Sequence, residues 1–371
     1  FGGLRAVLYT EAVQMVVLVI GSVLITAIGL SRIGGWANLV ATVGPERLTL
    51  FLPADHPEFP WPGMVLAPPI VGLWYWCTEQ YIVQRVLAGR DETQARRGTI
   101  FAAYLKLLPF FIFLLPGVIA YGLTQTGQLQ LESADQAFPA LVTNLLPVGL
   151  RGLVAGGLLA ALMSSLAAVF NSCSTLFTMD IYRKVRPEAS EETLVRVGRI
   201  ATGVVVVFGI AWIPIMERVS SELYTYLQSV QAYIAPPIAA VFFLGLFWSR
   251  LNVAGAMSAL VGGFVLGMVR LVLEINKDAL GTGAVFWFAD VNFLYFALLL
   301  TAVSVALLVG VSLAYPAPGT DQIDGLTYGT TMVEDRERSR ASWDARDVAL
   351  SAIVVVILIG IVVYFSPLGV G

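Results

Sequence analysis

Ala161, Ser164 and Ser165 have the chemistry and the spacing to bind a hard cation. They are separated by steps of three and four residues, so on a helix they share one patch of surface. A main-chain carbonyl and two hydroxyls there would supply three oxygen ligands, which suit a sodium ion. The small residues that precede them, from Gly152 onward, also predict close helix packing. Packing explains the glycines and alanines better than it explains two adjacent hydroxyls, so we predict a sodium site.

Other polar side chains lie inside apolar stretches, where an ionisable group costs at least ~2.5–3.5 kcal/mol and is by default a functional candidate. Lys106 offers three hydrogen-bond donors to a buried ligand; alternatively, its ammonium reaches the lipid headgroups. Gln228 and Gln231 are one helical turn apart and form a polar face suited to sugar hydroxyls. Hydrogen bonds between helices are the alternative role for the two glutamines.

An aromatic cluster follows two prolines in the second apolar stretch. Pro68 and Pro69 remove backbone donors and predict a break in the helix. A broken helix near the middle of the membrane is the usual sequence pointer to a transporter binding site. Trp74, Tyr75 and Trp76 then offer flat faces for a pyranose ring. An aromatic belt at the membrane surface is less consistent with their position in the middle of the segment.

The composition indicates a membrane protein. Of 371 residues, 57% are hydrophobic and 13% are charged, whereas soluble domains carry about 25% charged residues. The net charge of −3 gives no indication of nucleic acid binding. Cys77 and Cys173 both lie in apolar segments, which does not suggest a disulfide framework.

Nine stretches are long enough to cross a bilayer as helices, which takes about 20 apolar residues. We predict an all-α polytopic membrane protein, with residues 1–371 forming a single transmembrane domain and no strands. The predicted spans are 6–30, 62–84, 99–123, 152–182, 195–216, 223–248, 253–275, 286–314 and 348–366. The short apolar stretch from Phe138 to Leu150 is predicted to be an interfacial helix.

The distribution of Lys and Arg predicts the orientation. Fifteen positive residues fall on one side of the predicted spans and five on the other, and the richer side is cytoplasmic. Residues 31–61 are then an external loop with room for a short surface helix. Residues 315–345 are a charged cytoplasmic linker, which we expect to be solvated or partly disordered.

Four long runs resemble the sodium/glucose cotransporter branch of the sodium:solute symporter family. They are GGLRAVLYTEAVQ from residue 2, LWYWCTEQYIVQR from residue 73, FNSCSTLFTMDIY from residue 170 and YLQSVQAYIAPPIAAVF from residue 226. The resemblance implies a LeuT-type core of two inverted five-helix repeats with peripheral helices. The first span here would be the fifth core helix. Because the chain begins at Phe1, with neither an initiator methionine nor a signal peptide, we expect the earlier core helices to lie upstream.

The resemblance also implies roles for the polar residues of the sodium pathway. Ala161, Ser164 and Ser165 match the family's main sodium site, whose other ligands are carbonyls of the first core helix. Glu11 matches an acidic residue linked to sodium coupling or exit.

For the solute, the resemblance matches Lys106 and Gln228 to residues that hydrogen-bond the sugar. Tyr75 matches the tyrosine that stacks on the sugar as an inner gate, with Trp74 and Trp76 beside it.

Three features depart from the family pattern. Glu11 and Glu79 stand where relatives often have Asp, and Gly72 stands where sugar carriers often have Asn or Ser. The short 124–136 loop lacks the insert of animal members, which indicates a bacterial-type protein of the inner (plasma) membrane.

We therefore expect sodium-coupled symport of a sugar or polyol by alternating access, with sodium as the co-transported ion and the lipid bilayer as the surroundings. A symporter for another small solute and a non-transporting sugar sensor remain alternatives. An enzyme is not expected, because no nucleophile–base pair or phosphate loop is present and the single histidine, His56, lies in an external loop.

Overall fold

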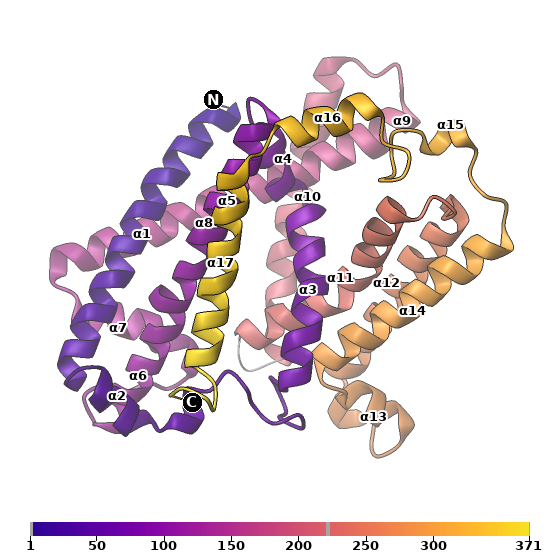
Figure 1. The fold of residues 1–371 in the computed structure, drawn as a ribbon. Helices are drawn as coiled ribbons and strands as arrows, with labels where there is room; N and C mark the ends of the chain where they lie inside the picture. Colours follow the sequence, from indigo (N-terminus) through magenta and orange to yellow (C-terminus); the bar gives the residue numbers. More distant parts are fainter. Residues whose placement is uncertain (1–2, 220–222, 371) are drawn as a thin grey trace. The chain divides into compact units, whose positions relative to one another are not determined.

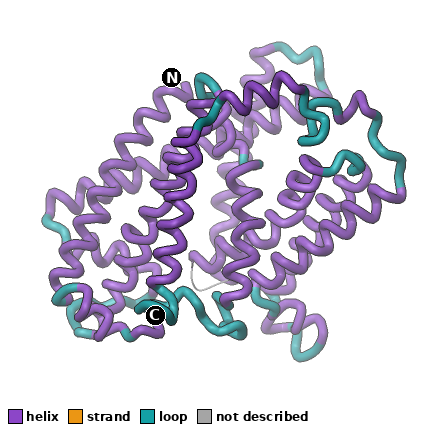
Figure 2. Tube along the Cα trace, viewed as in Figure 1, coloured by secondary structure: helices purple, strands orange, loops and turns teal. Residues whose placement is uncertain are grey.

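The computed structural model describes residues 3–219 and 223–370, which form helices joined by loops (Figures 1 and 2). No strand occurs within these residues, as the sequence predicts. The helices in chain order are α1 (Gly3–Ile33), α2 (Trp36–Val43), α3 (Trp61–Cys77), α4 (Gln80–Leu87), α5 (Glu92–Pro109), α6 (Leu115–Gln125), α7 (Ala137–Leu145), α8 (Val148–Leu176), α9 (Arg183–Val185), α10 (Glu191–Val219), α11 (Leu223–Phe247), α12 (Val253–Ile275), α13 (Ala284–Asp290), α14 (Phe293–Ala314), α15 (Thr320–Ile323), α16 (Val333–Ala341) and α17 (Ala345–Tyr364). Two wider π-helical segments, Phe110–Leu114 and Phe177–Tyr182, follow α5 and α8.

Eight helical segments of the described chain are long and apolar enough to cross a membrane. They correspond to eight of the nine predicted spans, with small shifts at the ends. They are Tyr9–Ile33, Glu92–Gln125, Val148–Val185, Glu191–Pro214, Leu223–Phe247, Val253–Ile275, Phe293–Ala314 and Ala345–Tyr364. The ninth predicted span, residues 62–84, is divided between α3 and α4.

The helix break in this region is not where the sequence predicts it. Pro68 and Pro69 lie inside α3, which continues to Cys77, so the prediction that they break the helix is wrong. A proline ring fixes φ at a value that a helix already uses, and surrounding protein can compensate for the lost donors. The chain leaves the helix nine residues after Pro69, at Thr78, and Glu79 is extended.

The chain forms two compact units. The first contains residues 1–50, 101–213 and 353–371, and the second contains residues 51–100 and 214–352. In the first unit, α1 packs against α8 and α6. Gly21 and Gly157 let α1 and α8 approach closely, because a Cβ on Gly21 would collide with Val154 and one on Gly157 would be 3.0 Å from a methyl of Val17.

In the second unit, α11, α12 and α14 lie side by side, and α3 packs on α11 (Figure 1). One face of α12 carries glycines where its neighbours come closest. A Cβ on Gly263 would be 2.6 Å from Pro237, and one on Gly267 would collide with the carbonyl of Tyr233. The side chains of Tyr233 and Phe296 fill the core beside them and are fully buried.

Both long loops contain helices. Residues 31–61 contain α2, a short helix for which the sequence leaves room. The linker at 315–345 is more ordered than expected, since it contains α15 and α16. It is attached to the end of α11: the Tyr328 N–H donates to the carbonyl of Leu246 at 2.8 Å, and the rings of Tyr328 and Phe247 are 5.8 Å apart.

Candidate functional site

The predicted sodium ligands lie on one uninterrupted helix. Ala161, Ser164 and Ser165 all belong to α8, in the first unit. Ser164 is half-buried, and its Oγ donates a hydrogen bond to Oε1 of Glu11 at 3.0 Å. Ser165 is exposed and Ala161 is half-buried. The structure therefore brings together two residues, Glu11 and Ser164, that are 153 positions apart in the sequence.

The glycine contact between α1 and α8 explains why Glu11 reaches Ser164. Gly157 meets Val17, and Ser164 lies seven residues after Gly157 while Glu11 lies six residues before Val17. Seven residues are nearly two helical turns, so both pairs fall on the same seam between two antiparallel helices. Close approach at the glycine therefore places a carboxylate and a hydroxyl within hydrogen-bonding distance.

This contact fits the chemistry of a monovalent cation. A serine hydroxyl has one proton and two lone pairs. Because the proton of Ser164 points to Glu11, the lone pairs of Ser164 remain available as ligands for sodium. The carboxylate adds negative potential nearby without itself needing to be a ligand. Within the described residues, no cluster of three or more His, Cys, Asp and Glu could hold a transition metal.

The aromatic cluster lies directly before the break between α3 and α4. The Tyr75 ring meets the edge of Trp76 at 5.2 Å and that of Tyr81 at 6.2 Å between centroids, and Trp74 is 6.3 Å away. The hydroxyl of Tyr81 donates to the hydroxyl of Tyr75 at 2.8 Å. The sequence analysis does not predict a role for Tyr81. It is the second residue of α4, six positions after Tyr75, and this short separation is the only indication of the contact in the sequence. Tyr75 is thus held on two sides, and Trp76 is exposed.

The predicted hydrogen-bonding residues lie in different units. Lys106 is exposed on α5 in the first unit, three residues before Pro109 and the π-helical segment. Gln228 and Gln231 are half-buried on α11 in the second unit. Helix α3, which carries the aromatic cluster, packs against α11. The second unit therefore joins the helix of Gln228 to the helix of Tyr75.

Sequence reasoning missed a charged pair inside α12. The side chain of Arg270 is only 2% exposed, and Glu274 follows one turn later. Arg270 Nη2 donates to the carbonyl of Val291 at 2.9 Å, and the Tyr233 hydroxyl donates to Glu274 Oε2 at 2.6 Å. The signal was available: an arginine and a glutamate four residues apart interrupt the otherwise apolar stretch 253–275.

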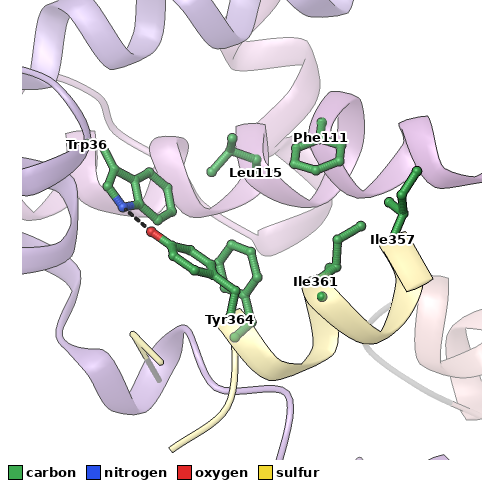
Figure 3. A pocket seen from close by; sticks show the side chains of 8 residues that line it. Trp36, Phe111, Leu115, Ile357, Ile361 and Tyr364 are labelled. Atoms are coloured by element: carbon green, nitrogen blue, oxygen red, sulfur yellow. Dashed lines mark hydrogen bonds between the residues drawn. The ribbon is translucent and has the colours of Figure 1, made fainter. Parts of the chain in front are cut away.

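An apolar cavity of about 460 Å³ lies in the first unit beside α17 (Figure 3). Phe111, Leu115 and Ile361 form much of its wall. Its polar contribution is the hydrogen bond from Trp36 Nε1 to the Tyr364 hydroxyl, at 3.0 Å. A cavity of this composition suits hydrocarbon rather than a sugar or an ion.

Comparison with known proteins identifies relatives over most of the chain. Residues 1–263 match the model of the sodium:solute symporter family. The chain is 39% identical over 364 residues to the sodium/mannose cotransporter SLC5A10 of Bos taurus, covering 89% of this chain and 61% of that protein. It is 37% identical over 365 residues to sodium/myo-inositol cotransporter 2 of Homo sapiens, covering 89% and 54%. It is 36% identical over 364 residues to sodium/glucose cotransporter 4 of Danio rerio, covering 89% and 55%.

A solved structure supports the fold. The outward-open, substrate-bound structure of a sodium-coupled sialic acid symporter has a TM-score of 0.64 to this chain at 22% identity, covering 85% of this chain and 64% of that one. This likeness confirms the predicted fold class, an all-α membrane protein with a LeuT-type core. The chain spans between 54% and 61% of the length of the three curated relatives above.

Proposed function

Because the chain belongs to the sodium:solute symporter family, we propose that it forms much of a carrier that couples sodium entry to uptake of a sugar or polyol. The observation that carries this proposal is the hydrogen bond from Ser164 to Glu11. It places a carboxylate beside the hydroxyls that are predicted to bind sodium. The family is one of membrane transporters, in agreement with the expectation that the chain is not an enzyme.

Sodium, as the co-transported ion, is bound by the Ala161 carbonyl and the hydroxyls of Ser164 and Ser165. Glu11 orients the Ser164 hydroxyl and favours the cation electrostatically. Ser165 is exposed on α8 in the described part of the chain, which leaves its hydroxyl open to an ion shared with the first core helix that the resemblance implies.

The solute is bound by aromatic faces and hydrogen-bonding side chains. Tyr75, held between Trp76 and Tyr81, presents a rigid ring against which the C–H face of a sugar packs. Within the second unit, Gln228 donates hydrogen bonds to hydroxyls and Trp74 completes the aromatic surface. For Lys106, which belongs to the first unit, the hydrogen bond to the sugar rests on the resemblance alone. The names of the relatives, which carry mannose, myo-inositol and glucose, support a sugar or polyol as the class of solute.

One sodium ion supplies enough energy for concentrative uptake. Moving one charge through 100 mV contributes about 2.3 kcal/mol, and a tenfold sodium gradient adds about 1.4 kcal/mol. Together these would sustain roughly a 500-fold solute gradient. Sodium binding favours the outward-open state, and rocking of the two repeats then releases both cargoes to the cytoplasm.

For location, we propose the inner membrane of a bacterium. The support is the short connection between α6 and α7, in which residues 126–136 hold only turns and the short 3-10 helix Ala134–Gln136.

The test is uptake of radiolabelled mannose, myo-inositol and glucose into proteoliposomes that contain the full-length natural protein. Uptake that concentrates one of these solutes with external sodium, but not with potassium, supports the proposal. Solute binding without sodium-driven accumulation contradicts symport and favours a sensor. No response to any of the three solutes contradicts the assigned solute class.

A further inference from the structure

A buried arginine lies within the apolar length of α12. The side chain of Arg270 is 2% exposed and that of Glu274 is 19% exposed. Charged side chains within membrane helices are costly, so they persist where they have partners and a function. Neither residue belongs to the sodium or solute residues described above.

The charged pair joins three helices of the second unit. Glu274 accepts a hydrogen bond from Tyr233 of α11 at 2.6 Å, and Arg270 donates to the Val291 carbonyl just before α14 at 2.9 Å. The guanidinium also lies 5.5 Å from the ring centre of Tyr233 and 5.7 Å from that of Phe296. We call Arg270, Glu274 and Tyr233 the Arg270 cluster.

The hydrogen bonds of Arg270 are incomplete. Its Nε and Nη1 are buried and have no hydrogen-bond partner within the described residues, and Nη1 lies 3.6 Å from Glu274 Oε2. A buried ion pair rarely stabilises a fold more than well-packed apolar side chains would. Stability alone is therefore a weak reason for this arginine to be present, and a role in positioning is a better one.

Helix α11 needs support where Tyr233 lies. Pro236 and Pro237 have no N–H, so the carbonyls four residues earlier, at Ala232 and Tyr233, lose their helical partners. The segment that carries Gln228 is thus joined to the rest of α11 through a weakened turn. Tyr233, fixed by its ring and its hydroxyl, attaches this segment to α12.

Gln228 and Tyr233 face different directions. Five residues separate them, which is a rise of about 7.5 Å and a rotation of about 140° along a helix. Tyr233 is fully buried against α12 and α14, whereas Gln228 is half-buried. Holding Tyr233 therefore fixes the rotation and height of Gln228 without contact between the Arg270 cluster and the solute.

We propose that the Arg270 cluster is a positioning device that sets the rotation of α11, so that Gln228 meets the solute in one orientation. The inference rests on the proposed function, because it assigns Gln228 to solute binding. Arg270, Glu274 and Tyr233 are positioning residues and do not themselves bind the solute.

The test compares Tyr233→Phe, Glu274→Gln and Arg270→Lys with the wild type in the full-length natural protein. Each change keeps the approximate volume and removes one hydrogen bond or one charge. We expect the apparent KM for the solute to rise about tenfold at saturating sodium, since hydrogen bonds to charged groups are among the stronger ones. The sodium concentration for half-maximal uptake should stay within about twofold, because none of the three changes alters a residue assigned to sodium.

Arg250→Gln is the matched control. Like Arg270, Arg250 donates to backbone carbonyls. Its acceptors are Ser312 at 2.6 Å and Tyr315 at 2.9 Å, at the C-terminal end of α14, and Arg250 itself lies at the opposite end of α12 from Arg270. This variant should lower thermal stability without changing the KM for the solute. If Tyr233→Phe fails to fold, the double variant Arg270→Met with Glu274→Met, which removes both charges together, replaces it.

Amide hydrogen exchange in residues 223–231 separates failure of the inference from failure of the proposed function. We expect faster exchange there in Tyr233→Phe and Arg270→Lys, but not in Arg250→Gln. Unchanged exchange or an unchanged KM in a folded variant would overturn the positioning role. Wild-type protein that carries no sugar or polyol would overturn the proposed function instead, and the exchange result would still decide whether the Arg270 cluster positions α11.

Discussion

Ser164 of α8 donates a hydrogen bond to Glu11 of α1 at 3.0 Å, across the seam on which Gly157 meets Val17. The carboxylate therefore fixes the direction of the hydroxyl proton. A cation that approaches α8 meets the lone pairs of Ser164 rather than its hydrogen.

Replacing Glu11 by Gln tests this arrangement. The amide keeps a similar shape and an acceptor oxygen but removes the negative charge, so sodium should bind more weakly. We expect the sodium concentration for half-maximal uptake to rise about tenfold, equivalent to about 1.4 kcal/mol. Sodium titration of solute uptake measures this concentration, with Glu46→Gln, a change at an exposed carboxylate in the loop 31–61, as the control. An unchanged sodium concentration for half-maximal uptake would contradict a role of Glu11 in sodium binding.

Ser165→Ala and Gln228→Ala should affect different ligands. Loss of the Ser165 hydroxyl should raise the sodium concentration for half-maximal uptake about tenfold, while the solute KM at saturating sodium stays nearly unchanged. Loss of the Gln228 amide should raise the solute KM while sodium binding is retained. Paired titrations of both variants measure the two effects. If Gln228→Ala has wild-type affinity for the solute, this glutamine serves only as a contact between helices.

Tyr81→Phe should weaken solute binding indirectly, through the orientation of Tyr75. It removes the hydrogen bond to the Tyr75 hydroxyl and keeps the edge contact between the rings. A neutral hydrogen bond contributes about 0.5–1.5 kcal/mol, so the solute KM should rise about two- to tenfold. Kinetics of uptake measure this change, and a wild-type KM would show that the orientation of Tyr75 does not depend on Tyr81.

Gly267→Ala should destabilise the second unit. The added Cβ would meet the carbonyl of Tyr233, which cannot move without shifting α11. Overpacking of this kind costs about 1–3 kcal/mol. Gly310→Ala on α14 is the matched control, because a Cβ there meets nothing within 4 Å. Thermal unfolding of the detergent-purified protein should separate the two variants, and equal melting temperatures would contradict the tight α11–α12 contact.

Asp344→Ala should loosen the start of α17. Asp344 Oδ1 accepts from the N–H of Asp347 at 3.2 Å, and Asp347 Oδ2 accepts in return from the N–H of Asp344 at 3.0 Å. Loss of such a reciprocal cap costs about 1 kcal/mol. Asp335→Asn, which alters an exposed charge pair at 3.9 Å, is the control and should be nearly neutral. Thermal unfolding of both variants checks this difference.

The sequence predicts the features that depend on local composition. Apolar runs predict eight of the spans, with ends that differ by at most seven residues, because lipid requires continuous helices of a set length. It fails where neighbouring helices decide the outcome. The prolines at 68 and 69 stay within α3, and the linker helix α16 forms although its sequence is highly charged.

The candidate site shows the same division. The spacing of Ala161, Ser164 and Ser165 could be read from the sequence because it lies within one helix. The hydrogen bond between Glu11 and Ser164 could not be read from the sequence, because it depends on packing between two helices and joins residues 153 positions apart. Arg270 and Glu274 could have been recognised from their charges alone, but Tyr233, which donates to Glu274 and stacks its ring near Arg270, belongs to another helix.

The π-helical segment Phe110–Leu114 separates α5 from α6 within one continuous span. A π-bulge adds one residue to the helical count, which rotates the residues of α5 by about 100° relative to those of α6. Lys106 therefore lies on a different face of the span from the α6 residues that a regular α-helix would align with it. Deleting a single residue from this segment would preserve the helix but turn Lys106 toward a different neighbour.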